Sequence, residues 1–418
     1  MKINQLHTIY LNSSGICTDT RTLKKDCIFF ALTGENFNGN EYASKAIELG
    51  ASNVVIDDLS YKKDERYIVV DNVLKSLQSL ASYHRSKLKC PVIGITGTNG
   101  KTTTKELMHC VLSSKFKTVC TKGNLNNDIG VPLTILSSPL DTEMLIVEMG
   151  ANHIREINTL CEMAQIDYGL ITNIGKAHLE GFGSYENIIK TKNELYQFIQ
   201  KKNKKVFVNK KDKLLVELSE KIDRVFYTDF KITNNEDSLA SVSINNKEVK
   251  TKLIGSYNTS NIIAAYTIAS YFGVDEKSIV ESLQNYTPSN NRSELKITDS
   301  KNTLILDAYN ANPTSMSLSI DSFLKVKKKS YWLILGDMLE LGKSSLEEHQ
   351  KIIDRLEEKN AKNVIIVGDE FGRCKHSYKH FDTVDLASKW ITTRPIINSH
   401  VLLKGSRGIK LEQLERVL

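Results

Sequence analysis

The segment "GITGTNGKTTTKEL", Gly94 to Leu107, decides the fold of the central part of the chain, because it is typical of a strand that ends in a glycine-bearing loop and continues into a helix. Gly97 and Gly100 let the backbone approach a ligand closely with its N–H groups pointing inward, and the helix beginning near Lys101 adds its positive end. We therefore expect Lys101 to meet the β- and γ-phosphates of a nucleotide and the Thr102 hydroxyl to hold Mg²⁺.

The spacing of this loop departs from the usual GxxxxGK(S/T) pattern, because Ile95 stands where the first glycine is expected. A strand-to-helix turn without a ligand is the structural alternative. The nucleotide interpretation assigns the whole loop to the nucleotide site: Gly97, Thr98, Asn99, Gly100, Lys101, Thr102 and Thr103.

Composition and charge restrict the partners of the chain. The 418 residues are 40% hydrophobic and 25% charged, and 56 Lys and Arg against 49 Asp and Glu give a net charge of +7. The basic residues are spread along the chain and form no stripe with interleaved aromatic residues, so we expect no nucleic-acid partner. No segment approaches 18 unbroken apolar residues and the start lacks a signal-peptide core, so we expect neither a membrane span nor secretion.

The seven cysteines are scattered, odd in number and without a CxxC pair. This pattern indicates reduced thiols rather than a zinc site or a disulfide framework, and it favours a cytoplasmic protein.

Short apolar runs alternate with helix-like stretches along the whole chain, which predicts an α/β fold with largely parallel sheets. We expect three domains. The first boundary falls near residue 83, in a helix that precedes "PVIGIT", and the second falls in the turn-rich segment "TPSNN", residues 287–291. The predicted domains are residues 1–83, 84–288 and 289–418.

Polar side chains follow the strands after the phosphate loop. Glu148 comes directly after the apolar run "MLIV", and His178 follows the strand "YGLITNI". Lys192 lies one strand-to-helix step further, on a helix predicted from Tyr185. The carboxyl ends of parallel strands share one sheet edge, so these groups could converge with Lys101 on a site for a second divalent ion. Each has a simpler alternative: a solvated strand-end Glu, a hydrogen-bonded His and a surface Lys.

Six segments together resemble the signature segments of the Mur ligases, in order and over nearly the whole chain. They are "GTNGKTTT", "GNLNNDIGVPLTIL", "EMGANHIREI", "AHLEGFGSYENIIKTKNEL", "DAYNANPTSM" and "GDMLELG".

The resemblance implies a three-domain enzyme with an N-terminal domain for a UDP-sugar peptide, a central ATPase domain and a C-terminal Rossmann-like domain that closes over ATP. Such an enzyme phosphorylates a carboxylate with ATP, and an amine then attacks the acyl phosphate. Within the family, "YNANP" with "GDMLELG" favours members that add D-Ala-D-Ala to UDP-MurNAc-tripeptide. We expect a cytoplasmic monomer that binds ATP, two Mg²⁺ ions and these two substrates.

The resemblance also assigns roles by position. Lys101, His178, Lys192 and Arg292 become catalytic residues, and Thr102, Glu148, His178 and Lys192 become metal ligands. Lys192 matches a lysine that the family carbamylates, a reaction that requires a neutral amine, and Lys190 should face another side of the same helix. Further ATP-site positions are Asn126, Asn127, Asn258, Asn261, Arg292, Asp307, Tyr309, Asn310 and Asn312.

Eight positions are expected to bind the other substrates. "TDTR" and "FFALTGENFNG" resemble the family's uridine-nucleotide site, although Asn38 and Asn40 depart from its common pattern, and "KGSR" at a strand end could contact the dipeptide or the acyl phosphate. The residues are Thr18, Asp19, Thr20, Arg21, Gly34, Asn36, Lys404 and Ser406.

Two other functions stay open at this point. The nearest is another amide ligase of the same superfamily, which would add a single amino acid to a muramyl peptide or glutamate to a folate. The second is an NTPase that acts on nucleic acid, which would show salt-sensitive binding of DNA or RNA.

Overall fold

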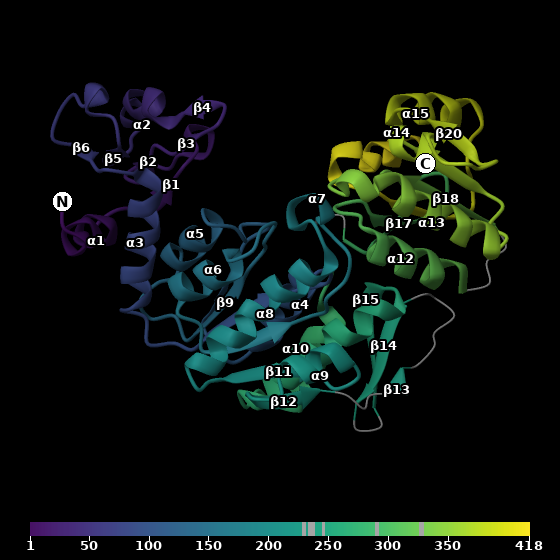
Figure 1. Ribbon diagram of the computed structural model, residues 1–418, viewed down its shortest axis with the longest axis horizontal. Coiled ribbons are helices and arrows are strands. Elements are labelled where there is room, and N and C mark those ends of the chain that lie inside the picture. Colours follow the sequence, from purple (N-terminus) through teal and green to yellow (C-terminus); the bar gives the residue numbers. More distant parts are fainter. Residues whose placement is uncertain (228–230, 233–238, 245–246, 289–291, 326–329) are drawn as a thin grey trace.

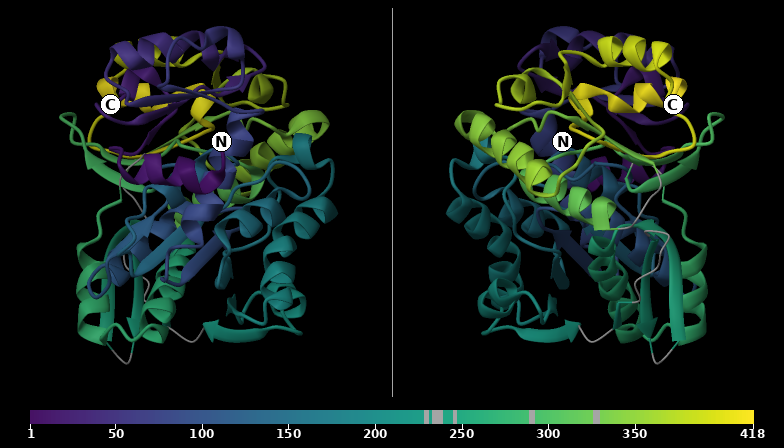
Figure 2. Two further views of the ribbon diagram at one scale, coloured as in Figure 1. Left: turned by 90° about the vertical axis from the view of Figure 1, so that its left-hand side faces the viewer. Right: turned by 90° about the vertical axis from the view of Figure 1, so that its right-hand side faces the viewer.

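The chain folds into three α/β units, each built on its own sheet (Figure 1). The computed structural model describes residues 1–227, 231–232, 239–244, 247–288, 292–325 and 330–418. In the side views, the purple N-terminal unit and the yellow C-terminal end both lie above the teal central unit (Figure 2). The α/β fold class predicted from the sequence is confirmed.

The N-terminal unit has a four-stranded parallel sheet in the order β1-β2-β5-β6. A short antiparallel hairpin, β3 with β4, lies beside it. The elements are α1 (Ile3–Leu11), β1 (Ile16–Cys17), β2 (Ile28–Phe30), β3 (Thr33–Gly34), β4 (Phe37–Asn38), α2 (Ala43–Glu48), β5 (Asn53–Ile56), β6 (Tyr67–Val69) and α3 (Val73–Arg85).

The central unit carries a six-stranded parallel sheet in the order β12-β11-β10-β7-β9-β8. The strand that leads into the phosphate loop, β7, lies between β9 and β10, so the chain leaves it toward one side of the sheet and later returns on the other. This is the topological switch point at which α/β sheets bind ligands. The strands are β7 (Val92–Thr96), β8 (Thr118–Cys120), β9 (Met144–Glu148), β10 (Tyr168–Ile171), β11 (Lys205–Asn209) and β12 (Asp223–Tyr227).

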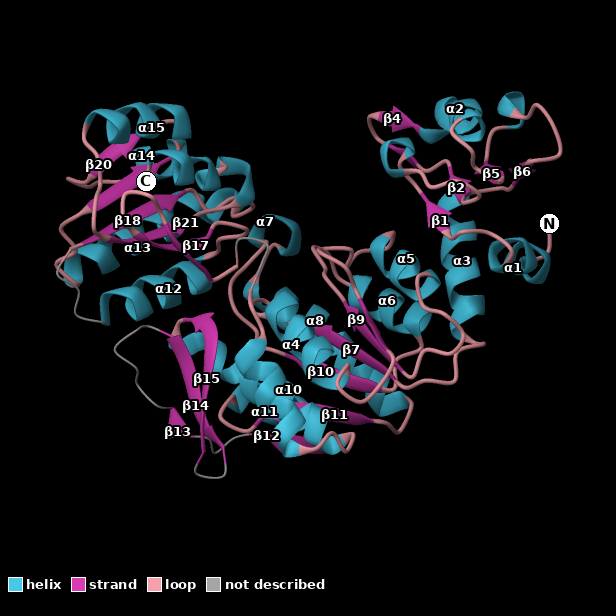
Figure 3. Cartoon of the chain, turned by 180° about the vertical axis from the view of Figure 1, so that it is seen from behind, coloured by secondary structure: helices cyan, strands magenta, loops and turns pink. Residues whose placement is uncertain are grey.

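Helices cover both faces of this sheet (Figure 3). Apolar residues of α4 and α10 pack on one face, and those of α3, α5, α6 and α8 pack on the other. The helices are α4 (Lys101–Leu112), α5 (Gly130–Leu136), α6 (Glu156–Ala164), α7 (Leu179–Phe182), α8 (Tyr185–Lys201), α9 (Lys213–Leu218), α10 (Thr259–Tyr271) and α11 (Glu276–Asn285).

One element of the central unit was not predicted. β13 (Lys231–Ile232), β14 (Leu239–Ile244) and β15 (Lys247–Ile254) form an antiparallel sheet. Its buried face, which includes Val242 and Val249, joins the core under α10, so the segment that leads to α10 is sheet rather than loop.

The C-terminal unit has a six-stranded sheet in the order β16-β17-β21-β18-β19-β20, antiparallel only at β16. β21 lies between β17 and β18, so the loops after these three strands share one edge. The elements are β16 (Glu294–Ile297), β17 (Thr303–Asp307), α12 (Pro313–Lys325), β18 (Tyr331–Gly336), α13 (Ser345–Glu358), β19 (Val364–Val367), α14 (Asp369–Gly372), β20 (Lys379–Phe381), α15 (Val384–Thr393) and β21 (His400–Lys404).

The two predicted domain boundaries fall on different kinds of structure. Residue 83 lies inside α3, whose Leu77 and Leu80 share one core with Val131 and Leu160 of the central unit. Residues 289–291 of the second boundary lie outside the described residues. The boundaries themselves stay predictions.

Two further expectations concern the chain as a whole. All seven cysteines are free thiols, and five of them are buried. Among the helices that the structure describes, none combines the length and the apolar composition that a membrane span requires.

The end of α3 yields a stability prediction. The buried Arg85 guanidinium donates to the carbonyl oxygens of Ala164 (3.0 Å) and Leu88 (3.0 Å) and pairs with Asp167 (3.0 Å). Arg85→Ala should lower the free energy of unfolding by about 3 kcal/mol, because it leaves buried acceptors and a carboxylate without their partner. Urea denaturation measures this.

The matched control is Arg66→Ala, which removes an exposed ion pair with Asp64 (2.6 Å) and should change the free energy of unfolding much less than Arg85→Ala does, because solvent screens the pair. Equal losses in the two variants would contradict a structural role of Arg85.

Candidate active site

Two positions of the phosphate loop have a backbone conformation and surroundings that only glycine fits. Gly97 has φ +140°, and a Cβ there would lie 2.0 Å from the Thr172 hydroxyl oxygen. Gly100 has φ +79°, and a Cβ there would lie 2.7 Å from Oδ1 of Asn261. Any larger residue would push the loop away from β10 and α10, so this geometry supports the phosphate-loop interpretation.

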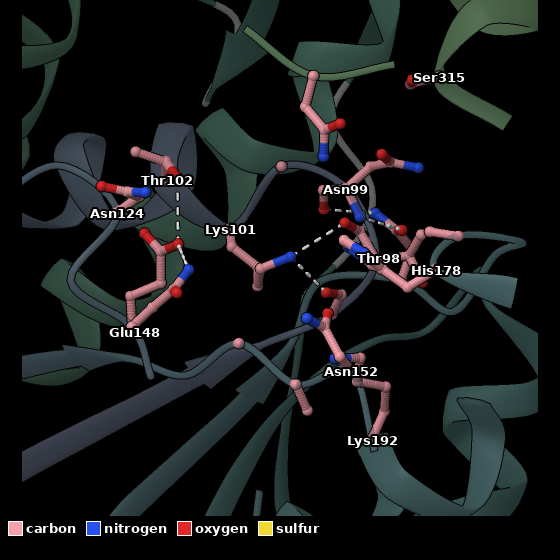
Figure 4. A pocket seen from close by; sticks show the side chains of 18 of the residues that line it. Thr98, Asn99, Lys101, Thr102, Asn124, Glu148, Asn152, His178, Lys192 and Ser315 are labelled. Carbon is pink, nitrogen blue, oxygen red and sulfur yellow. Dashed lines mark hydrogen bonds between the residues drawn. The ribbon is translucent and has the colours of Figure 1, made fainter. Parts of the chain in front are cut away.

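Lys101 begins α4 and lies at the centre of the site (Figure 4). Its Nζ donates to the carbonyl oxygens of Gly97 (2.7 Å) and Thr98 (3.0 Å). Burial lowers the pKa of Lys101 to about 8, and the nearby Arg292 adds to this effect, whereas Glu148 opposes it. The loop thus holds a desolvated ammonium group at the point where phosphate is expected.

Glu148 ends β9 and is 1% exposed. One carboxylate oxygen, Oε1, accepts from the Thr102 hydroxyl (3.2 Å) and from the Asn126 side-chain amide (2.8 Å). Among the described residues the other oxygen, Oε2, has no hydrogen-bond partner, and Lys105 Nζ lies 3.9 Å from it. A buried carboxylate with an unused oxygen beside a threonine hydroxyl suits a bound divalent cation.

Lys192 is buried on α8, with 3% of its surface exposed. Its Nζ lies 5.7 Å from the centre of the Phe182 ring. Burial lowers the pKa of Lys192 to about 7, and the positive charge of Lys101 lowers it further, while Glu156 and Glu194 act in the opposite direction. The neutral form of the Lys192 amine is therefore far more populated near pH 7 than that of an ordinary lysine. Lys190 is exposed, in agreement with its predicted orientation.

His178 precedes α7 with a left-handed backbone, φ +50°. Burial lowers its pKa, and the positive charges of Lys101 and Lys192 lower it further. Its Nδ1 contacts a carboxylate oxygen of Glu340, which belongs to the C-terminal unit. In Figure 4, Thr102 and Glu148 lie on one side of Lys101, and His178 and Lys192 lie on the other.

These groups line one cavity of about 760 Å³ between the central and C-terminal units. The predicted residues that line it are Gly97, Thr98, Asn99, Gly100, Lys101, Thr102, Thr103, Asn126, Asn127, Glu148, His178, Lys192, Asn258, Asn261, Arg292, Asp307, Tyr309, Asn310 and Lys404.

Two contacts at this cavity join the units directly. Asn312 Nδ2 donates to Oδ1 of Asn99 (2.7 Å), and Asn99 Nδ2 approaches Oδ1 of Asn312 (3.4 Å). Within the C-terminal unit, the guanidinium of Arg292 stacks on Tyr309 at the same cavity, with 3.8 Å between Cζ and the ring centre. Asn312 thus contacts the phosphate loop through Asn99 but is not among the residues that line the cavity.

Three predicted positions in the C-terminal unit are already engaged by the protein. Lys404 Nζ donates to Oδ2 of Asp307 (2.6 Å), so a predicted substrate residue and a predicted ribose acceptor pair with each other. The Ser406 hydroxyl accepts from the Leu339 backbone N–H (2.9 Å), and Ser406 is 4% exposed. Their roles toward ligands stay predictions.

The predicted uridine-site residues lie on the N-terminal unit, and the cavity wall, as far as the structure describes it, includes none of them. Arg21 pairs with Asp19 (2.6 Å) on the surface. Gly34 lies in β3, and Asn36 is in the turn to β4. Thr18 and Thr20 flank Asp19 at the end of β1.

Several cavity residues were not predicted. Asn152 and His153 lie within "EMGANHIREI", Asn124 lies within "GNLNND" and Ser315 lies within "DAYNANPTSM", so a signal for them was present. Tyr257 carries no signal of its own.

Lys105 was missed for a different reason. Its position on α4 reads as an ordinary helix lysine, but it is 1% exposed and lies between Glu148 and Glu106, 3.9 Å and 3.8 Å from their carboxylate oxygens. Buried lysines require such partners.

Comparison with known proteins gives the class of this fold and site. Residues 95–269 match the family profile "Mur ligase middle domain", and residues 291–407 match "Mur ligase, glutamate ligase domain". The chain belongs to the Mur ligase family of ATP-dependent ligases.

Individual relatives share one name. The chain is 32% identical to UDP-N-acetylmuramoyl-tripeptide–D-alanyl-D-alanine ligase of Bacillus subtilis, over 97% of this chain and 93% of the relative. It is similar to crystal structures of MurF from Acinetobacter baumannii (27% identity, TM-score 0.83, covering 99% and 98% of the two chains) and of MurF from Thermotoga maritima in complex with ADP (26%, TM-score 0.83, 97% and 97%).

The position of Lys101 leads to a prediction. Lys101→Met should lower kcat for ATP-dependent phosphate release by more than about 100-fold, because it removes a desolvated cation from the charge that develops on the transferred phosphoryl group. Lys115→Met, which changes an exposed lysine beyond the end of α4, is the control. A Lys101→Met variant with unchanged kcat would exclude this role.

Proposed function

We infer that this protein joins D-Ala-D-Ala to UDP-MurNAc-tripeptide with ATP, which yields UDP-MurNAc-pentapeptide, ADP and phosphate in peptidoglycan precursor synthesis. The observation that carries this inference is the similarity to ligases of that name over 97% of the chain. The cavity between the central and C-terminal units supports it, because it holds the phosphate loop together with groups suited to activate a carboxylate.

The reaction must bring two anions together, the terminal carboxylate of the tripeptide and the γ-phosphate of ATP. We propose that the carboxylate attacks the phosphate to give an acyl phosphate, and that the dipeptide amine displaces phosphate from it. Lys101, at the mouth of the loop, offsets the repulsion between the two anions. Arg292, stacked on Tyr309 at the opposite wall, brings a second cation from the C-terminal unit.

Mg²⁺ would neutralise phosphate oxygens when bound, and the residues present fit one such ion. Thr102 and the free oxygen of Glu148 are the groups that would hold it. In the described part of the chain no three His, Cys, Asp or Glu side chains cluster as a metal site, so phosphate oxygens and water would complete the coordination.

We propose a second ion between His178 and a carbamylated Lys192. The support is the lowered pKa of Lys192, since only a neutral amine captures CO₂ and the product is a carboxylate-like ligand. The carbamate would also replace a buried positive charge beside Lys101 by a negative one.

The remaining proposals assign one substrate-binding role to each of the three units. We propose that residues 1–83 bind UDP-MurNAc-tripeptide through Thr18 to Arg21, Gly34 and Asn36. Residues 84–288 then bind ATP, and residues 289–418 close over it and bind D-Ala-D-Ala. We further propose that the enzyme acts as a monomer in the cytoplasm, where its seven free cysteines stay reduced.

The activity is tested with pairs of substrates. Incubated with ATP and UDP-MurNAc-tripeptide, the enzyme should release phosphate and form pentapeptide only when D-Ala-D-Ala is present, as measured by phosphate assay and mass spectrometry. Single amino acids, and glutamate with a folate, are the comparison arms. Phosphate release that depends on a single amino acid and ignores the dipeptide would assign the chain to another ligase of the superfamily.

Lys192 and Lys190 offer a matched pair on one helix. Lys192→Ala should lose more than about 100-fold in kcat and regain part of it with formate or acetate, because a small carboxylate can occupy the place of the carbamate. Lys190→Ala should keep full activity, since Lys190 is exposed.

A ¹³C NMR signal after exposure to labelled bicarbonate should be present in the Lys190→Ala protein and absent in the Lys192→Ala protein. Full activity of the Lys192→Ala variant without added acid would remove Lys192 from the mechanism.

A further inference from the structure

The segment "GDMLELG", Gly336 to Gly342, forms the loop after β18, and its start is anchored within the C-terminal unit. The Asp337 carboxylate accepts from the backbone N–H groups of Glu370 (3.0 Å) and Phe371 (3.0 Å). The Met338 N–H donates to Nε2 of His349 (2.9 Å). These contacts involve buried groups and do not reach the cavity, so they fix the path of the loop.

The end of the loop turns toward the central unit. The Leu339 N–H is held by the Ser406 hydroxyl (2.9 Å), and Glu340 then adopts a left-handed backbone, φ +63°. A non-glycine residue in this conformation is uncommon and persists where its surroundings hold it. The turn directs Glu340 away from its own sheet.

The loop docks on α7, the short helix that follows His178. The Glu180 N–H donates to the carbonyl oxygen of Glu340 (3.2 Å), and a Cβ added at Gly342 would lie 3.2 Å from that of Glu180. Leu179 packs against the apolar core of the C-terminal unit. The Glu340 carboxylate contacts Nδ1 of His178 at the same place.

We propose that Glu340 is a positioning residue supplied by the C-terminal unit, whose carboxylate holds the His178 imidazole with Nδ1 toward the loop and Nε2 toward the cavity. This proposal rests on the proposed function of the site. It extends that function, because His178 would reach its working orientation only when the C-terminal unit is docked.

The chemistry of the imidazole supports this role. A carboxylate accepts a hydrogen bond only from a protonated ring nitrogen, so the proposed bond to Nδ1 selects the neutral tautomer whose lone pair is on Nε2. In the described part of the chain Nδ1 has no partner of hydrogen-bond geometry, and the Glu340 carboxylate is the acceptor that already lies in ion-pair contact with it. Carboxylates commonly orient functional histidines in this way.

The test uses five variants of the full chain. Glu340→Ala removes the carboxylate, Glu340→Gln keeps its shape without the charge, and Glu340→Asp restores the charge on a shorter side chain. The matched control is Glu348→Gln, because Glu348 also pairs across this interface, with Lys176 (3.0 Å), but away from the cavity. Steady-state kinetics and ¹⁵N NMR of histidine-labelled enzyme at about pH 8 are measured, with His178→Gln to assign the signals.

We expect Glu340→Ala to lower kcat by about 10- to 100-fold with little change in KM for ATP, Glu340→Gln to lose less, and Glu340→Asp to recover part of the rate. The ¹⁵N shifts of His178 should move from the Nδ1–H tautomer toward a mixture in Glu340→Ala alone. Glu348→Gln should keep both the rate and the tautomer.

Three results would overturn the proposal. The first is an unchanged kcat in Glu340→Ala, and the second is an unchanged tautomer of His178 in that variant. The third is an equal loss of kcat in Glu348→Gln, which would show that weakening the interface anywhere has the same effect. The NMR measurement requires no turnover. It therefore separates a failure of this proposal from a failure of the proposed function.

Discussion

The burial of two lysines in one cavity is the constraint on which the site depends. Lys101 and Lys192 lie on different helices, α4 and α8, and each is desolvated enough to lower its pKa, to about 8 and about 7. A protein accepts such a cost where an anion will arrive, because the anion restores the lost solvation. Lys101 therefore favours the binding of phosphate, whereas the lowered pKa of Lys192 favours the neutral amine that the proposed carbamylation requires.

The order of the strands explains how the cavity is built. β7 carries the phosphate loop, and its neighbours β9 and β10 deliver Glu148 and the segment to His178 at the same edge. The C-terminal sheet is arranged in the same way. Because β21 lies between β17 and β18 and all three strands are parallel, Asp307, Lys404 and the "GDMLELG" loop lie at one edge. The two edges face each other, so the residues of each sheet form one wall of the cavity.

The contacts between the two units differ in kind, and this difference has consequences for function. Asn99 with Asn312 and Lys176 with Glu348 are polar pairs that hold the interface together. The contact of Glu340 with His178 joins the interface to a residue of the site itself. Because inter-domain interfaces of this polar type are the ones that open and close, such a contact can make the chemistry depend on docking.

Local sequence signals account for the parts of the fold and site that were predicted. The period of the apolar runs predicted the α/β units, and Gly97 and Gly100 predicted the loop, since only glycine fits their backbone. Glu148 and His178 were found because each comes at or after the end of a buried strand of one parallel sheet, whereas the resemblance to the Mur ligases assigned the role of Lys192, which lies on α8. The antiparallel strands β14 and β15 were not predicted. An apolar run indicates that a segment is buried, but it does not indicate whether that segment pairs with its neighbour in a parallel or an antiparallel direction.

The sequence by itself therefore determined which side chains lie at the carboxyl edges of the sheets. The spacing of apolar residues, with a period of two in strands and 3.6 in helices, locates the elements, and the order of the chain then gives the residues that follow each strand. Only the tertiary structure decided which of them meet. The burial of Lys192 depends on the elements packed around α8, and the pairing of Lys404 with Asp307 depends on the register of β21 beside β17. The contact of Glu340 with His178 depends on how one unit packs on another. These contacts join residues more than 90 positions apart, and the burial of a side chain requires several elements that exclude water from it together. No local sequence pattern encodes a distant contact or burial of this kind.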